Sequence, residues 1–203
     1  AGLLALIAAH AHQEAFGPYL KGQWEFFYLW YLVTAWRRIE TDPIFSAADR
    51  GAVRVFLSGW GDLTAAACYL QPGANRPGEI RQNHALCAAV SMLDVADYFT
   101  RSDQIKTDQP AWQQALDQSR IIVEGQLVSY RPNDDGGGNI YTWNNVAEMI
   151  HWYMQRGDTR LFQSGHVARL ADLAILTIDN RRDEVSYGDT LTYMPWAAST
   201  HLR

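Results

Sequence analysis

The sequence predicts an all-α fold, and three observations support this prediction. Apolar residues recur at helical spacing along most of the 203 residues. Turn-forming stretches rich in Gly, Pro, Asn and Asp interrupt these runs at short intervals, and the alternating pattern typical of strands does not occur. Because short turns join helices into antiparallel pairs, about seven or eight helices predict a curved array or incomplete α/α toroid of helical hairpins. We treat residues 1–203 as one helical domain.

In the first part of the chain, the predicted helices are bounded by residues that stop or cap helices. The run 24–40 contains no Gly or Pro and ends at the Thr-Asp-Pro sequence 41–43, because the residue before a proline disfavours the helical conformation. Ser46 and Asp49 form a variant capping box, with Asp in place of Glu or Gln. This box precedes the apolar run 51–60, which is the second predicted helix.

The rest of the chain continues the helical pattern up to its last segment. Pro110 marks one helix start, since proline is tolerated in the first helical turn. The segment 185–203 is rich in β-branched and aromatic residues and is predicted to form an extended exit segment. The predicted helical pieces of this part span 62–70, 81–99, 111–130, 142–156 and 161–180.

Composition narrows the functional classes. The hydrophobic content of 48% and charged content of 19% are typical of a globular protein. The net charge of −5 and the lack of a dense Lys/Arg cluster argue against a nucleic-acid partner. The apolar stretch 3–9 is too short to span a bilayer and lacks the basic flank of a signal peptide, so no membrane association is expected.

Neither the cysteines nor any known short sequence motif predicts a reactive or cofactor-binding site. Cys68 and Cys87 each lie in an Ala-rich stretch and are predicted to be free, buried thiols, with a disulfide as the alternative that the sequence leaves open. No phosphate loop or dinucleotide-binding motif occurs, and no cofactor is expected. The chain starts without Met and ends abruptly, which suggests a processed protein or a piece of a longer one.

The strongest candidate site combines an Asn-His pair with a later tyrosine. Asn83 and His84 lie early in one apolar helix, where Asn alone is also a common helix cap. Tyr141 follows a run of three glycines, and glycine-rich loops let backbone approach a ligand closely. Asn donates hydrogen bonds, His donates or accepts them, and Tyr can transfer a proton. Together they suit removal of a proton from the carbon beside a carboxylate.

This pattern resembles the helical toroid domain of polysaccharide lyases, in particular the heparinase II/III-like and alginate lyase families. In those families an Asn-His motif on a helix is followed, at a comparable separation, by a tyrosine on a loop that leads into the next helical pair. The Tyr-Gly-Asp sequence 187–189 also resembles the end of the helical domain in some members. The chain departs from the family pattern after the Asn-His pair, where Ala85-Leu86-Cys87 replaces the second His or aromatic residue of many relatives.

The resemblance implies β-elimination on a uronic-acid polymer. Asn83 would hydrogen-bond the substrate carboxylate, and Tyr141 and His84 would share the proton transfers. Because the ordinary pKa of tyrosine is about 10, a cation such as Arg131 or a protonated His84 would have to lower the pKa of Tyr141. The other expected substrate-binding residues are Trp143, Asn144 and His151.

The resemblance also implies further properties of the whole protein. Full lyases of this type carry a β-sandwich domain, which these 203 residues lack, and they are periplasmic or secreted. The expected partner of this chain is therefore an acidic polysaccharide, with neither nucleic acid nor membrane. No metal is expected at the site.

Two alternatives use the acidic residues differently. Asp134 and Asp135 on the Gly-rich loop, with Glu148 nearby in sequence, offer the paired carboxylates of an inverting glycoside hydrolase on an α/α toroid. The spacing of Glu148 and His151 puts both on one helix face. Di-iron bundles use two such motifs plus two further Glu, whereas this chain has a single copy. His166 is expected on a helix surface.

A third alternative is not an enzyme. The same helical array, with an aromatic groove formed from some of the 8 Trp and 10 Tyr, would serve as a carbohydrate- or protein-binding module. In that case Asn83, His84 and Tyr141 need not converge.

Overall fold

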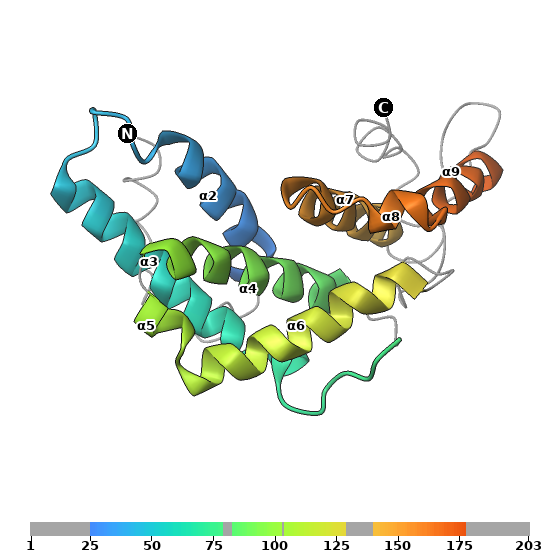
Figure 1. Cartoon of the computed structure of the whole chain (residues 1–203), viewed down its shortest axis with the longest axis horizontal. Helices are drawn as coiled ribbons and strands as arrows, with labels where there is room; N and C mark the ends of the chain where they lie inside the picture. Colours follow the sequence, from blue (N-terminus) through green and yellow to red (C-terminus); the bar gives the residue numbers. More distant parts are fainter. Residues whose placement is uncertain (1–24, 79–82, 103, 129–139, 178–203) are drawn as a thin grey trace. The chain divides into compact units, whose positions relative to one another are not determined.

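The structure is a computed structural model that describes residues 25–78, 83–102, 104–128 and 140–177 (Figure 1). Several predictions lie outside the described residues. They concern the apolar stretch 3–9, Arg131, Asp134, Asp135 and the exit segment 185–203. The side chains of Tyr141, Trp143 and Asn144 also lie outside the described part, although the backbone there is helical.

The described residues are helical and contain no strand, which confirms the all-α prediction. The arrangement of the helices as a toroid of hairpins stays a prediction. The helices are α2 (Glu25–Ile39), α3 (Ala47–Ala65), the 3₁₀ turn η2 (Cys68–Leu70), α4 (Asn83–Ser102), α5 (Gln104–Thr107), α6 (Pro110–Val128), α7 (Ile140–Gln155), α8 (Arg160–Gln163) and α9 (His166–Thr177).

The predicted helix ends are accurate where a cap or a proline defines them. α2 ends just before the Thr-Asp-Pro sequence, and α6 begins at Pro110. Ser46 Oγ accepts a hydrogen bond from the Asp49 amide at 3.1 Å, and Asp49 Oδ2 accepts one from the Ser46 amide at 2.8 Å. The variant capping box is therefore confirmed, and it satisfies two amides near the start of α3.

At two glycines the helices differ from the prediction. α3 continues through Gly61, where the sequence suggested two separate apolar pieces, and the missing side chain there leaves room for the ring of Trp112, with which a Cβ atom would collide. The predicted helix 161–180 is divided into α8 and α9 by Gly165, whose φ of 72° is a conformation that glycine adopts readily. In both cases glycine serves a geometric need that its helix propensity does not reveal.

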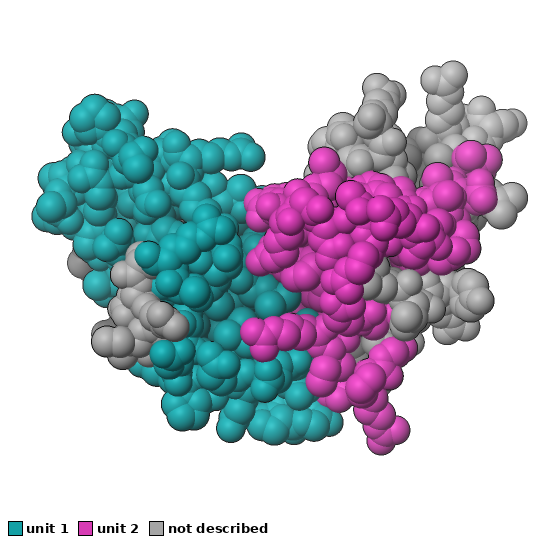
Figure 2. Space-filling model, viewed as in Figure 1, with its two compact units in different colours: residues 1–74, 91–119 teal, residues 75–90, 120–203 magenta. Residues whose placement is uncertain are grey.

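The chain divides into two compact units, which are described separately (Figure 2). Unit 1 comprises residues 1–74 and 91–119, and unit 2 comprises residues 75–90 and 120–203. α4 and α6 each contribute residues to both units. The single-domain assignment for 1–203 stays a prediction.

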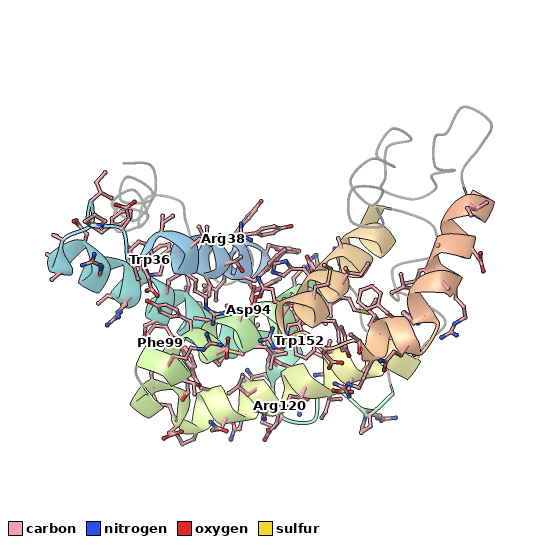
Figure 3. All side chains as sticks on the ribbon, turned by 45° about the horizontal axis from the view of Figure 1, so that its top comes forward. Trp36, Arg38, Asp94, Phe99, Arg120 and Trp152 are labelled. Atoms are coloured by element: carbon pink, nitrogen blue, oxygen red, sulfur yellow. The ribbon has the colours of Figure 1, made fainter. Side chains whose placement is uncertain are left out.

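The core of unit 1 is built around α2, which packs against α3 and contacts the second half of α4. The fully buried Trp36 of α2 donates a hydrogen bond from Nε1 to the Tyr98 hydroxyl at 3.1 Å (Figure 3). Tyr98 in turn donates to Glu40 Oε2 at 3.0 Å. Burial is the main cause that raises the pKa of Tyr98, so this hydroxyl keeps its proton.

Ser91 of α4 connects to the backbone of α2. Its hydroxyl donates to the Phe26 carbonyl oxygen at 2.5 Å and accepts from the Trp30 amide at 3.2 Å. These two backbone groups are four residues apart, so they would be partners in a regular helix. The Ser91 hydroxyl therefore bridges one turn of α2 and fixes the register of α4 against it.

In unit 2, α7 packs against α8, and α8 packs against α9. Arg160 of α8 forms ion pairs with Glu124 of α6 at 2.9 Å and with Asp158 at 2.7 Å. Trp152 and Tyr153 of α7 are buried, with their rings in an edge-to-face contact. α7 thus presents a largely apolar face to the interior of unit 2, and this face carries the candidate site described next.

Candidate functional site

Asn83 and His84 open α4 within unit 2. Asn83 is 6% exposed, and its side-chain oxygen Oδ1 accepts a hydrogen bond from the His84 amide at 2.9 Å. This contact fixes the orientation of the amide, because the oxygen faces the backbone of the first helical turn. His84 is half-buried. The pair therefore lies at a helix start, as the sequence predicted, with an oriented Asn side chain.

One turn further along α4, Cys87 contacts α7. The Cys87 thiol donates a hydrogen bond to Glu148 Oε1, with 2.9 Å between sulfur and oxygen. Cys87 is 1% exposed and Glu148 is 6% exposed. A carboxyl group and a thiol therefore face each other in the interior of unit 2.

Burial controls the protonation of both groups. Desolvation raises the pKa of Glu148 to about 8, and the hydrogen bond from Cys87 opposes that rise. Desolvation, followed by the negative charge of Glu148, raises the pKa of Cys87 well above its ordinary value. At neutral pH both groups carry their protons, so the contact joins two neutral side chains.

Glu148 has one oxygen without a described partner. Oε2 is buried and has no hydrogen-bond partner among the described residues. Buried polar atoms in native proteins are nearly always hydrogen-bonded, so this oxygen is an exception that requires an explanation.

Helical spacing relates this contact to the other candidate residues. Asn83 precedes Cys87 by four residues on α4, and His151 follows Glu148 by three residues on α7. Residues at these spacings share one helix face. The Cys87–Glu148 contact therefore brings the face of α4 that carries Asn83 against the face of α7 that carries the half-buried His151.

Tyr141 lies at the start of the same helix. Its backbone is in the first turn of α7, seven residues before Glu148, whereas the sequence suggested a loop position. α7 begins two residues earlier than predicted, since Ile140 is already helical. The structure thus joins the two helices that carry Asn83, His84 and Tyr141, while the Tyr141 side chain lies outside the described part.

Cys87 and Glu148 have no role in the main hypothesis from the sequence, which predicts Cys87 as a buried thiol and Glu148 as a metal or hydrolase candidate. A signal was present, because Glu148 is a single carboxylate in a stretch with the apolar residues Met149, Ile150 and Trp152. Its partner lies 61 positions away, so the sequence could not identify the pair.

Two predicted exposures need correction. Cys68 is a free thiol but is exposed, because α3 ends at Ala65 and only Leu70 of the following 3₁₀ turn is buried. His166, expected on a surface, is 1% exposed, since α9 begins at this residue and packs against α8.

Among the described residues, no group of three or more His, Cys, Asp or Glu side chains is arranged to hold a metal ion. None of the helices in this part combines the length and the apolar character needed to cross a bilayer.

Unit 1 contains a pocket of about 370 Å³ that involves none of the predicted site residues. It is lined by the end of α3, the loop after η2 and the start of α6, including Asp62, Gln71 and Trp112. The Asp62 carboxylate accepts a hydrogen bond from Trp112 Nε1 at 2.8 Å and pairs with Lys106 at 2.7 Å. These contacts give Asp62 a structural role in tying α3 to α6.

Comparison with known proteins adds no relative. No protein-family model, no curated protein and no solved structure matches this chain.

Proposed function

We propose that this chain is the helical part of a polysaccharide lyase that cleaves a uronic-acid-containing glycan by β-elimination. The observation that carries the proposal is the buried Cys87–Glu148 contact, which joins α4 near Asn83 and His84 to α7, whose first turn contains Tyr141. The proposal includes an incomplete α/α toroid of helical hairpins. It also implies a periplasmic or secreted protein, where an acidic polymer is the substrate.

The proposed reaction removes the proton at C5 of the uronate. The electron pair of that C–H bond forms a C4=C5 double bond, and the C4–oxygen bond to the neighbouring sugar breaks. Tyr141 and His84 take opposite proton-transfer roles, so that one accepts the C5 proton and the other protonates the leaving oxygen. Asn83 donates to the substrate carboxylate and stabilises the negative charge that develops on it.

The environment of Asn83 supports its proposed role. Its amide is oriented by the contact with the His84 backbone, and the side chain is largely removed from water. An oriented donor in a site of low polarity stabilises developing charge more strongly than a solvated donor. Removal of such a donor typically lowers kcat by about 10²–10³-fold.

The test is a cleavage assay on alginate and on glycosaminoglycans, read by the ultraviolet absorbance of the unsaturated product. We expect cleavage by the wild type, loss of cleavage in Tyr141→Phe, and a fall of about 10²–10³-fold in kcat for Asn83→Ala. Tyr28→Phe is the matched control, because Tyr28 is exposed on α2 in unit 1. A Tyr141→Phe variant that keeps the wild-type rate would remove Tyr141 from the mechanism.

A second candidate is an inverting glycoside hydrolase. It is favoured by Glu148, whose pKa of about 8 keeps the carboxyl protonated at neutral pH, as a general acid requires. Asp134 or Asp135 would then be the base. Hydrolysis produces new reducing ends without the unsaturated product, so the same assay separates the two reactions. Binding of glycans without any turnover would instead favour a helical binding module.

A further inference from the structure

Glu148 places an acid group in the buried interior of unit 2. One of its oxygens accepts from the Cys87 thiol, and the other is buried with no partner among the described residues. A glutamine at this position could offer the same acceptor oxygen to Cys87 without an ionisable group. The feature to explain is therefore an acid group in the interior, close to the proposed site.

The distance from Glu148 to the site follows from the helix geometry. Asn83 and Cys87 are neighbours on one face of α4, and such neighbours have Cβ atoms about 5–6 Å apart. The Glu148 oxygen lies 2.9 Å beyond the Cys87 sulfur. The carboxyl group is therefore within about 10 Å of the Asn83 side chain.

Resting on the proposed lyase function, we propose that Glu148 is a positioning residue whose neutral carboxyl ties α7 to α4 beside Asn83, and whose ionisation weakens the binding of a uronate substrate. The substrate carboxylate brings one negative charge to Asn83. A second negative charge about 10 Å away repels it, and at an effective dielectric constant of about 20 this weakens binding on the order of tenfold.

Among the described residues, burial and the Cys87 hydrogen bond shift the pKa of Glu148, and no positively charged side chain contributes to that shift. From α4, Glu148 faces Cys87, a thiol that carries no positive charge in either protonation state. On α7 itself the nearest titratable position is His151. On the neighbouring elements, Arg160 of α8 is engaged by Glu124 and Asp158, and His166 of α9 is buried.

The ionisation of Glu148 occurs at a pH that a kinetic assay can reach. Burial raises the pKa of Glu148 to about 8, so ionisation occurs above neutral pH and below the ordinary pKa of tyrosine. At neutral pH the protein therefore binds substrate with the Glu148 carboxyl uncharged.

The experiment measures kcat and KM from about pH 6 to about pH 10 for wild type and Glu148→Gln. Two substrates are compared, a polyuronate and its fully methyl-esterified form, which lacks the charge. We expect the wild-type KM for the charged polymer to rise on the order of tenfold through about pH 8. The rise should be absent in Glu148→Gln and absent for the methyl ester. An equal rise in both proteins, or on both substrates, would overturn the inference.

Two further variants keep the test independent of how well Glu148→Gln folds. Glu124→Gln is the matched control, because Glu124 is an exposed acid of unit 2 that pairs with Arg160, and its KM profile should follow that of the wild type. Cys87→Ala removes the hydrogen bond that lowers the pKa of Glu148. The rise in KM should therefore move to higher pH in Cys87→Ala, and a shift to lower pH would contradict the proposed role.

The failure of this inference is distinguishable from the failure of the proposed function. Calorimetric titration with a uronate oligosaccharide reports binding without turnover. Cleavage with a pH-independent KM overturns the role of Glu148 and leaves the lyase proposal standing. Binding that weakens above about pH 8 only when Glu148 is present, without cleavage of any uronate, overturns the lyase proposal alone. Neither binding nor cleavage overturns both.

Discussion

The Cys87 thiol lies 2.9 Å from Glu148 Oε1, and this contact joins two helices whose contacting residues are 61 positions apart in the chain. It has an electrostatic consequence, because a carboxyl group with little access to water is stable only in its neutral form. The same two side chains that connect α4 and α7 therefore make unit 2 sensitive to pH.

Glu148 should make stability fall as pH rises. Its pKa is about 8 in the folded state against 4.5 for the unfolded chain, so between these values the unfolded state loses a proton that the folded state keeps. The folded state is then disfavoured by about 1.4 kcal/mol per pH unit, at most. Relative to wild type, Glu148→Gln should gain stability from about pH 4.5 to about pH 8 and no further above it. Denaturant unfolding at a series of pH values measures this, and parallel curves would contradict it.

Gly61 should not tolerate a side chain. A Cβ atom there would lie 2.5 Å from Cζ2 and 2.7 Å from Cη2 of the buried Trp112 ring. Gly61→Ala should therefore destabilise the fold by about 1–3 kcal/mol, as overpacking does. Gly59 of the same helix is the matched control, since a Cβ atom there meets nothing within 4 Å. Gly59→Ala should instead stabilise by up to about 1 kcal/mol, and equal effects in thermal unfolding would refute the steric explanation.

Ser91→Ala should weaken the packing of α4 on α2. The hydroxyl bridges the Phe26 carbonyl and the Trp30 amide, and its loss should cost about 1–2 kcal/mol of unfolding free energy. Ser119 provides the control, because its buried hydroxyl donates to the Ala115 carbonyl oxygen of its own helix and bridges no second helix among the described residues. Ser119→Ala should therefore be close to neutral. Hydrogen exchange of the Trp30 amide should also become faster in Ser91→Ala alone.

The capping box should stabilise the protein by satisfying amide groups in the first turn of α3. Ser46→Ala removes the acceptor for the Asp49 amide and should cost about 1 kcal/mol. Ser46→Asp keeps a side-chain acceptor at the cap and should retain most of that stability. Thermal unfolding of the two variants checks that Ser46→Ala loses more stability than Ser46→Asp. Similar losses of stability in both variants would show that the side-chain cap is not the cause.

Local signals explain why so much of the helical pattern could be predicted. The end of α2, the cap of α3 and the start of α6 each depend on residues within a few positions, such as Pro43, Ser46 and Pro110. Such signals act through backbone sterics and short-range hydrogen bonds, so they can be recognised from neighbouring residues in the sequence.

The features that the sequence could not provide depend on distant partners. Gly61 separates two apolar pieces in the sequence, and the sequence alone does not show that its missing side chain leaves room for the ring of Trp112 within a continuous α3. In the sequence Glu148 is an ordinary acidic residue of a helix, and its contact with Cys87 is visible only in the structure. For the candidate site, the position of the Asn-His pair at a helix start was predictable, whereas the contact that links it to α7 was not.

The two thiols also differ in their use as chemical handles. Cys68 is exposed in unit 1, whereas Cys87 in unit 2 is buried and holds its proton against Glu148. Because the thiolate is the reactive form, a maleimide reagent at neutral pH should label Cys68 and leave Cys87 untouched in the native chain. The unmodified protein therefore already carries one accessible attachment point for a fluorophore, on unit 1. The rate at which Cys87 becomes labelled would then measure how fast unit 2 opens.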